Sequence, residues 1–260
     1  MARTYDRIRL GVSSLVWGAD LSQPARFETF LDEAAEIGYE GILVFDMTAM
    51  PWLDRPAEFR ALLQRRGLDF AGVILRPNMD FRTTERLCGF MAEAGADVMN
   101  ISGRDGTEAE WQIVLPALMR HAEIAHRHGV RASYQHHTGW IAETMEEYER
   151  LLADTDRRYL GVMTDCGHAT KDFKGHTAQE FILRHPELEY IEFKDYTPQT
   201  DLNTEVGRGL ADWPAIADAV RQIGYRGWIV VEQNGSFRPA RISAAESFHY
   251  VRDVLGLGRR

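Results

Sequence analysis

Short apolar runs alternate with amphipathic segments along the whole chain. The apolar runs, each bounded by polar residues or glycine, predict eight strands, at 8–14, 39–45, 68–75, 96–102, 130–137, 160–165, 189–194 and 227–232. Between them, apolar positions recur every three or four residues, which predicts eight helices, at 25–38, 56–67, 82–95, 108–129, 143–155, 178–185, 212–224 and 243–256. The pattern is therefore an alternation of strand and helix, repeated eight times.

The ends of the predicted helices support this alternation. Five of them end in a glycine shortly before the next strand, at Gly38, Gly67, Gly95, Gly129 and Gly224. A glycine at this position is typical of a left-handed C-cap that turns the chain back. Eight such units, without a linker rich in Pro, Gly or Ser, predict an α/β fold, with residues 1–260 forming a single (β/α)₈ TIM-barrel domain.

An open doubly wound sheet is the alternative fold, and the pattern and length favour it less. The first strand-to-helix turn has neither a GxGxxG nor a Walker loop, which argues against nucleotide binding. The formal net charge of −9 argues against a general binder of nucleic acid.

The cysteines and the apolar segments indicate the cellular compartment in which we expect the protein. Cys88 and Cys166 lie in no CxxC pair and are too few for a disulfide framework in 260 residues. The first residues contain no long apolar stretch, and no run approaches the ~18 apolar residues of a membrane-spanning helix. We therefore expect a cytoplasmic protein with no membrane partner.

In a TIM barrel the active site lies at the carboxyl ends of the strands. Polar and aromatic side chains gather at those predicted ends, namely Ser13, Ser14, Trp17, Arg76, Asn100, Ser102, Gln135, His136, His137, Asp165, His168, Glu192, Lys194 and Glu232. Carboxylates from three successive strands, with histidines beside them, are the ingredients of an oxygen-rich divalent metal site.

Plainer interpretations remain open for several of these residues. Asp165 can cap the following turn, and His136 and His137 can be ordinary hydrogen-bonded residues. Glu232 is harder to explain in this way, because an unpaired carboxylate at the end of the apolar run "GWIVV" would be costly to bury.

Several motifs along the chain resemble those of a known family. They are "LGVSSLVWGAD", "YQHHTGWIAETMEEYERLL", "DCGHA", "FKDY", "GRGLADWPAIADAV" and "GYRGWIVVEQN". Their order and spacing resemble the xylose-isomerase-like TIM-barrel family of sugar isomerases and epimerases, over essentially the whole chain. Within it, the pattern is most similar to the inosose (2-keto-myo-inositol) dehydratases.

The resemblance implies a metal-dependent lyase or isomerase that acts on a keto-sugar or keto-cyclitol. The reaction would proceed through abstraction of an α-proton and formation of an enediolate. The alternatives within the family are a sugar epimerase or isomerase, and an enzyme that cleaves C-glycosides by β-elimination from a 3-keto-glycoside. An alternative of another class is a catalytically silent sugar-binding or partner subunit, and a homo-oligomer is also open.

The resemblance also implies a ligand set, since the family holds a divalent metal with Glu, Asp, His and Glu from strands five to eight. Asp165 matches the aspartate of an Asp-Thr-Gly-His motif in which Cys166 replaces threonine, and Glu232 matches the last ligand. Glu143, in "AET", matches the first ligand of the dehydratase-like pattern. Other branches place that glutamate at the strand end, where this chain has Gln135.

The third ligand departs from the family motif His-x-Lys-Asp, because "EFKD" puts Glu192 in the place of the histidine and keeps Lys194. Glu192 can still coordinate, and an all-carboxylate set favours Mn²⁺, with Mg²⁺ or Co²⁺ as alternatives. It can instead pair with Lys194 or an arginine and leave a metal-free catalyst or a binding protein. In a third interpretation Glu192 is itself an acid or base.

The remaining roles follow from the same resemblance. Glu143 or His137 would remove the proton, and His168 or Lys194 would stabilise charge on oxygen or protonate a leaving hydroxyl. Four further residues are assigned to substrate binding, namely Trp17, Gln135, His136 and Arg208. Trp17 and Trp140 can cover a sugar or simply pack, and the "GRG" around Arg208 can meet a phosphate or form a loop. We expect a sugar or cyclitol without phosphate.

Overall fold

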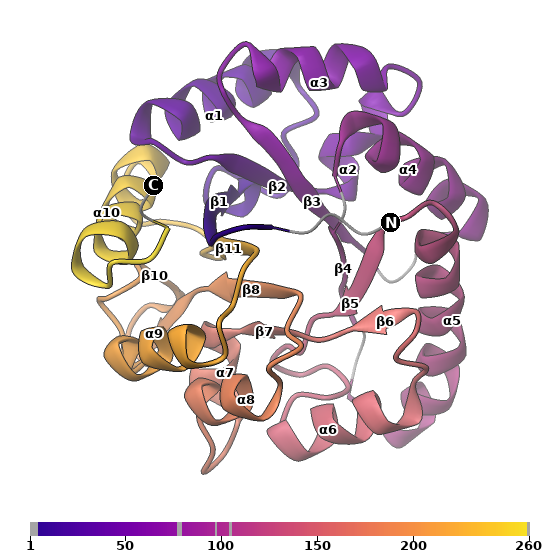
Figure 1. The fold of residues 1–260 in the computed structure, drawn as a ribbon, viewed down its shortest axis with the longest axis vertical. Coiled ribbons are helices and arrows are strands. Elements are labelled where there is room, and N and C mark those ends of the chain that lie inside the picture. Colours follow the sequence, from indigo (N-terminus) through magenta and orange to yellow (C-terminus); the bar gives the residue numbers. More distant parts are fainter. Residues whose placement is uncertain (1–4, 77–79, 97, 104–105, 259–260) are drawn as a thin grey trace.

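The chain folds into a ring of parallel strands surrounded by helices (Figure 1). The computed structural model describes residues 5–76, 80–96, 98–103 and 106–258. Nine strands of one sheet pair in the order β6-β5-β4-β3-β2-β1-β11-β8-β7, and every pair is parallel. They are β1 (Arg9–Ser13), β2 (Gly41–Phe45), β3 (Asp69–Leu75), β4 (Val98–Ile101), β5 (Arg131–Tyr134), β6 (Leu160–Gly161), β7 (Met163–Asp165), β8 (Tyr190–Phe193) and β11 (Trp228–Val231).

The two outer strands of this order are consecutive in the chain. Only Val162 separates β6 from β7, and together they occupy the single strand predicted at 160–165. β6 pairs with β5 and β7 pairs with β8, so the sheet returns on itself and forms a barrel. The predicted TIM barrel is confirmed.

The helices of the repeat lie outside the barrel (Figure 1). They are α1 (Pro24–Ile37), α3 (Pro56–Gln64), α4 (Phe81–Ala94), α5 (Glu108–Arg127), α6 (Met145–Asp154), α8 (Ala178–Arg184), α9 (Trp213–Gln222) and α10 (Ala240–His249). The five predicted capping glycines all have positive φ, between 65° at Gly224 and 109° at Gly38, which confirms the left-handed caps.

Several elements were not predicted from the sequence. α2 (Asp46–Ala49) follows β2, and α7 (Cys166–Asp172) follows β7 directly. β9 (Asp195–Thr197) and β10 (Asp201–Thr204) form a separate antiparallel hairpin. Short 3₁₀ turns span Ser14–Val16 and Met50–Trp52, and a π-helical turn, Tyr250–Val254, ends the predicted last helix. These pieces are too short to show a periodic apolar pattern.

Two apolar clusters stabilise the fold. The larger one lies between the strands and the helices, and the smaller one comprises Leu43, Ala71, Ile74, Val98, Met163, Tyr190, Trp228 and Val230. Because side chains alternate along a strand, Tyr190, Glu192 and Lys194 share one direction, whereas Ile191 and Phe193 pack in the larger cluster. The sequence of β8 therefore directs its charged residues into the barrel.

Two further observations concern the cysteines and the helices. Cys88 and Cys166 are both buried free thiols. In the part of the chain that the structure describes, no helix has the length and apolar character needed to cross a membrane.

Candidate active site

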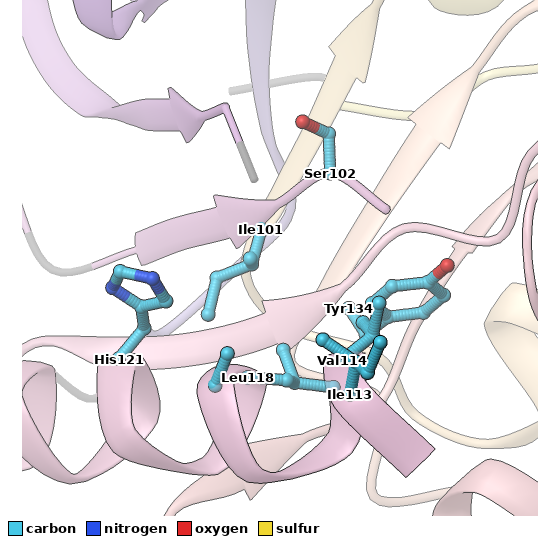
Figure 2. Close-up of a pocket in the computed structure, with 8 residues that line it drawn as sticks. Ile101, Ser102, Ile113, Val114, Leu118, His121 and Tyr134 are labelled. Carbon is cyan, nitrogen blue, oxygen red and sulfur yellow. The ribbon is translucent and has the colours of Figure 1, made fainter. Parts of the chain in front are cut away.

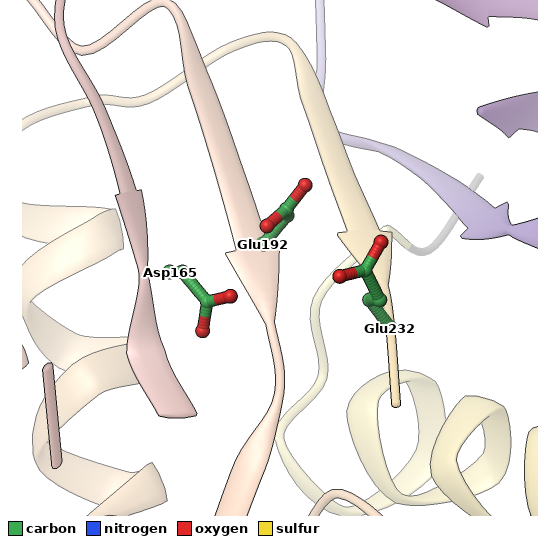
Figure 3. A group of neighbouring side chains, drawn as sticks. All are labelled: Asp165, Glu192 and Glu232. Atoms are coloured by element: carbon green, nitrogen blue, oxygen red, sulfur yellow. The ribbon is translucent and has the colours of Figure 1, made fainter. Parts of the chain in front are cut away.

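Three buried carboxylates meet at the carboxyl ends of neighbouring strands. Asp165 ends β7, Glu192 lies in β8 and Glu232 follows β11 directly, and Figure 3 shows the three side chains next to one another on these strands. One ligating oxygen from each lies within 4.8 Å of the others. Strand pairing explains the meeting, since Asp165 is in register with Glu192, and β11 pairs with the other side of β8.

Lys194 forms ion pairs with two of these carboxylates. Its Nζ lies 3.0 Å from Asp165 Oδ2 and 2.7 Å from Glu232 Oε1, and its side chain is 1% exposed. Burial alone would lower the pKa of Lys194, but the carboxylates of Asp165, Glu232 and Glu192 raise it. For Asp165, burial acts to raise the pKa, but Lys194, the neighbouring His168 and His136, and the backbone N–H of His168 together lower it. The pair is therefore charged.

Glu192 has neutral hydrogen-bond partners. Its Oε1 accepts from the Tyr190 hydroxyl at 2.8 Å and from Asn100 Nδ2 at 3.2 Å, and its Oε2 accepts from Gln135 Nε2 at 2.6 Å. Burial, followed by the charges of Glu232 and Asp165, raises the pKa of Glu192 well above its ordinary value. The surroundings of Glu192 thus favour its protonated form.

Asp165 uses its two oxygens for different purposes. Oδ1 accepts from the backbone N–H groups of Gly167 (2.9 Å) and His168 (3.0 Å), which caps the start of α7. Oδ2 faces Lys194 and Gln135 Nε2, the latter at 3.3 Å. The capping role considered for this residue is therefore present, and the other oxygen remains directed towards the site.

Two histidine rings lie beside the carboxylates. The His137 and His168 rings are 4.0 Å apart, and Trp140 stacks on His137 at 3.8 Å. His168 Nε2 is buried, has no hydrogen-bond partner in the part of the chain that the structure describes, and lies 3.9 Å from Asp165 Oδ2. Burial lowers the pKa of His168 well below its ordinary value and also lowers that of His137, so both rings are neutral near pH 7.

Thr138 connects this histidine pair to α7. Its backbone N–H lies 3.3 Å from His168 Nδ1, and its hydroxyl lies 3.1 Å from the same nitrogen. The hydroxyl donates to Asp172 Oδ2 at 2.5 Å. The histidine is thus held from the side opposite to its unpartnered nitrogen.

Glu143 and Gln135 were alternatives for the first ligand position, and the structure separates them. The Glu143 carboxylate accepts from the Gly139 N–H at 3.0 Å and is not a member of the three-carboxylate group. Gln135 instead touches two members of that group, Asp165 and Glu192. The ligand and base roles of Glu143 stay predictions.

His136 points into the layer between the barrel and the helices. Its ring lies 4.7 Å from Phe173 and 5.1 Å from Tyr148, and its Nε2 accepts from the Asp165 N–H at 3.1 Å. Burial lowers the pKa of His136 to about 3. This packing favours the plainer interpretation, a hydrogen-bonded core residue that supports the backbone of Asp165.

Trp17 and Arg208, both assigned to substrate binding, have protein partners. The Trp17 indole donates to Glu33 Oε2 at 2.5 Å, and its ring lies 4.9 Å from Phe30. The exposed Arg208 pairs with Glu246. Their substrate contacts stay predictions.

The segment around Arg208 is anchored by Asp195. The Asp195 carboxylate accepts from the N–H groups of Gly207 (3.0 Å), Gly209 (2.9 Å) and Ala211 (3.2 Å), and from Trp213 Nε1 (2.6 Å). A Cβ on Gly209 would lie 2.1 Å from Asp195 Oδ1, so only glycine fits there. These contacts favour the loop interpretation of "GRG".

Sequence reasoning gave no site role to Tyr190, Thr138, Asp172 or Asp195, and it placed Asn100 at a strand end without a specific role. Strand parity is a signal for Tyr190, because it stands two residues before Glu192 on the same face. Thr138 lies in a loop and Asp172 is the last residue of α7, and no sequence pattern marks their contact.

An apolar cavity lies away from these residues, between β4, β5 and α5 (Figure 2). Its lining includes Ile101, Ser102, Val114, Leu118, His121 and Tyr134, and of these only Ser102 was among the residues at the predicted strand ends.

The carboxylate group fits a divalent cation. Its donors are oxygens, which hard divalent ions prefer, and the buried Glu232 Oε2 has no hydrogen-bond partner among the described residues. Lys194 occupies one oxygen of Asp165 and one of Glu232, so a cation would share these carboxylates with the ammonium group. A general divalent site is therefore available in Asp165, Glu192 and Glu232.

Comparisons with known proteins agree on the fold. A family model described as "Xylose isomerase-like TIM barrel" matches residues 31–253. Inosose dehydratase of Geobacillus kaustophilus (strain HTA426) is 25% identical over 280 residues, 89% of each chain. The crystal structure of a D-allulose 3-epimerase from Methylomonas sp. covers 97% of this chain and 99% of its own, with a TM-score of 0.80 and 18% identity. The structure of the IOLI protein with a bound zinc atom covers 95% and 98%, with a TM-score of 0.70 and 16% identity.

Proposed function

Because the chain belongs to the xylose isomerase-like TIM-barrel family, we propose that it is a metal-dependent lyase or isomerase acting on a keto-sugar or keto-cyclitol. The observation that carries the proposal is the buried group of Asp165, Glu192, Glu232 and Lys194 at the carboxyl ends of the strands, where enzymes of this fold have their active sites. Dehydration of an inosose is the first candidate reaction, because inosose dehydratases match most of the chain.

We propose Asp165, Glu192 and Glu232 as metal ligands, with Glu143 as the fourth if its loop moves. The all-oxygen donor set supports Mn²⁺, with Mg²⁺ or Co²⁺ as alternatives. One solved neighbour carries zinc, which supports a divalent ion in general. When bound, such an ion supplies the Lewis acidity that makes a proton next to a ketone easier to remove.

The chain's own residues would divide the proton transfers. His137 or Glu143 takes the α-proton, and the C–H electron pair forms the carbon–carbon double bond of an enediol. His168 or Lys194 donates to the oxygen atoms that gain charge. In dehydration, one of them also gives a proton to the β-hydroxyl, which leaves as water.

The fate of the proton separates the alternative reactions. Its return to the opposite face of the same carbon gives an epimer, and its transfer to the neighbouring carbon gives an isomer. In C-glycoside cleavage, the aglycone carbon that is bonded to the sugar leaves the 3-keto-glycoside in place of the β-hydroxyl, and it takes up a proton as it leaves. The same residues serve each reaction.

The test is exchange of α-protons with solvent. Purified protein, loaded with Mn²⁺, is incubated in D₂O with 2-keto-myo-inositol, a ketohexose or a 3-keto-glycoside, and the substrate signals are followed by NMR after the metal is removed. We expect loss of the α-proton signal of one substrate, and loss of this activity with EDTA. A protein that retains no metal and exchanges no α-proton after metal replenishment would refute the proposal.

The role of Glu192 can be tested by Glu192→His, which restores the family motif. We expect tighter metal retention, measured by elemental analysis, because a neutral imidazole would replace a carboxyl group whose raised pKa opposes the loss of the proton that metal binding requires. Glu187→His, an exchange on the exposed surface, is the matched control. If Glu192→His changed neither metal content nor exchange rate, Glu192 would not be a ligand.

One observation favours a second candidate, a metal-free catalyst or silent sugar-binding subunit. Lys194 already neutralises two of the carboxylates that a cation would need. Both forms of this candidate predict that a keto-sugar raises the melting temperature without metal. The metal-free catalyst would also exchange α-protons in the presence of EDTA, and the silent subunit would exchange none.

A further inference from the structure

Arg76 follows β3 at the carboxyl end of the barrel. Its strand neighbours indicate its direction, because Leu75 packs in the larger apolar cluster and Ile74 packs in the smaller one. Side chains alternate along a strand, so Arg76 leaves the chain in the same inward direction as Ile74. Three strands separate β3 from β8 on either side of the ring, so Arg76 stands across the barrel from Glu192 (Figure 1).

A buried carboxylate holds Arg76 in place. Asp46 Oδ1 accepts from Arg76 Nε at 2.7 Å, and Asp46 Oδ2 accepts from the backbone N–H of the same residue at 3.0 Å. The Asp46 side chain is 0% exposed, whereas that of Arg76 is 43% exposed. Within the described residues no other group accepts from this guanidinium, so its terminal nitrogens Nη1 and Nη2 are available to a ligand.

Asn100 links this side of the barrel to the carboxylate group. It is in register with Ile74 on the neighbouring strand, and its Nδ2 donates to Glu192 Oε1 at 3.2 Å. Arg76 stands two residues beyond Ile74, which is about 7 Å along the strand. A small molecule that reaches the carboxylate group can therefore also reach the guanidinium of Arg76.

We propose that Arg76 binds a carboxylate of the substrate that is several carbon atoms away from the ketone. The inference rests on the proposed function and narrows its substrate class to acidic keto-sugars. An inosose carries no carboxylate, so the inference favours a keto-sugar acid over an inosose.

The shape of the guanidinium suits such a group. Its two terminal nitrogens form a planar edge, which can donate two parallel hydrogen bonds to one carboxylate. The contact with Asp46 already restricts the rotamers of Arg76, so less conformational entropy is lost on binding. At the opposite side of the barrel, Asp165, Glu192 and Glu232 would repel a carboxylate, which orients the acidic end of the substrate towards Arg76.

A carboxylate fits this position better than a phosphate. Arg76 is a single guanidinium, and Asp46 already balances its charge. Lys194 is the other cation that directly follows a strand of the barrel in the described part of the chain, and it is 1% exposed and paired with Asp165 and Glu232. A phosphate ester, which carries about two negative charges at neutral pH, would therefore find no second cation.

The experiment is isothermal titration calorimetry of the protein, in buffer containing Mg²⁺, with D-fructose, D-fructuronate and D-fructose 6-phosphate. These ketoses differ only at the last carbon, which carries a hydroxyl, a carboxylate oxygen pair or a phosphate ester. We expect D-fructuronate to bind with a Kd at least about tenfold lower than that of D-fructose, because it gains charge-assisted hydrogen bonds. Equal affinity for these two, tighter binding of the phosphate, or binding of none of the three would overturn the proposal.

Variants test whether Arg76 causes this preference. Arg76→Gln should abolish the preference for D-fructuronate and leave the affinity for D-fructose nearly unchanged. Arg120→Gln is the matched control, since Arg120 is an exposed arginine that pairs with Glu123 on α5, and it should keep the preference.

A double variant covers the case in which Arg76→Gln does not fold because Asp46 stays buried without its partner. Asp46→Asn combined with Arg76→Gln removes both charges together. A preference for D-fructuronate that survived in either variant would overturn the proposal, because the carboxylate would then bind elsewhere, for example to the metal ion. Loss of the preference in Arg120→Gln would overturn it as well.

The same data separate this inference from the proposed function. Exchange of α-protons in 2-keto-myo-inositol, without a preference for the carboxylate, would overturn the role of Arg76 and leave the proposed function intact. A preference that depends on Arg76, without α-proton exchange in any ketose, would overturn the proposed function and leave the carboxylate site intact.

Discussion

Removal of the Lys194 ammonium group should reveal how strongly the carboxylates depend on it. Its Nζ bonds Asp165 at 3.0 Å and Glu232 at 2.7 Å, and all three side chains are at most 2% exposed. Breaking a buried ion pair by removing one partner costs about 3–5 kcal/mol, because an uncompensated charge stays buried. Lys194→Met keeps most of the side-chain volume and should lower the free energy of unfolding by this amount, which is roughly 6–20 °C in Tm.

Lys171→Met is the matched control for this exchange. Lys171 also forms an ion pair, with Asp201 at 2.7 Å, but its side chain is 22% exposed and that of Asp201 is 54% exposed. Such pairs contribute about 0–1 kcal/mol. The measurement is urea unfolding of both variants with EDTA.

Addition of a divalent ion gives the second half of this test. In Lys194→Met the ion no longer shares Asp165 and Glu232 with an ammonium group, so Mn²⁺ should stabilise the variant more than the parent protein. An ion present at about 100 times its Kd adds about 2.7 kcal/mol. Equal losses in Lys194→Met and Lys171→Met would refute the buried ion pair, and equal stabilisation of variant and parent by Mn²⁺ would refute the shared ligands.

Three other regions give separate predictions. Gly209→Ala should destabilise the fold by about 1–3 kcal/mol in urea unfolding, because its Cβ would lie 2.1 Å from Asp195 Oδ1. The control Gly89→Ala lies in a helix, and its Cβ would have its nearest neighbour at 3.8 Å, so it should not destabilise the fold. Equal effects of the two exchanges would contradict the contact with Asp195. Burial lowers the pKa of His121 from 6.5 to about 4, so folding favours its neutral form. The contribution of this residue to the free energy of unfolding is complete above pH 6.5 and is lost as the pH falls towards 4. The dependence of unfolding free energy on pH should be shallower in His121→Gln, and an unchanged slope would count against this. Burial also raises the pKa of the Cys88 thiol to about 12, so at pH 8 a disulfide reagent should modify it at least about 100-fold more slowly in the native protein than in urea; similar rates would show that the thiol is accessible.

The barrel could be predicted from the sequence because most of its helices and strands are long enough for their periodic apolar patterns to be recognised. α4 and α5, with 14 and 20 residues, carry several turns of apolar spacing. α7 has only seven residues and begins where β7 ends, so its pattern could not be separated from the loop. The β9–β10 hairpin follows β8 after Lys194 alone, and its register contains an irregularity that strand alternation does not predict.

In the candidate site, the residues at strand ends could be expected from the sequence to lie together, whereas those in loops could not. Asp165, Glu192, Lys194 and Glu232 stand at or near strand ends, and the barrel topology brings such positions together. Glu143 lies beyond β5 in a segment where Gly139 has φ of 75° and Ala142 has φ of 61°. A left-handed alanine follows from no local preference, so the path of this segment, and with it the place of Glu143, could not be derived from the sequence.

The two carboxylate oxygens of Asp165 contact two different parts of the structure. The oxygen that starts α7 also receives the N–H of His168, while the other belongs to the charged group. Exchange to a residue without a side-chain acceptor would loosen the first turn of a helix and displace a histidine at the same moment as it removed the charge. Exchange to asparagine, whose amide oxygen can accept the same N–H groups, would remove the charge alone. The placement of the histidine and the charge of the group are therefore tied to one carboxylate, but only its second oxygen depends on that charge.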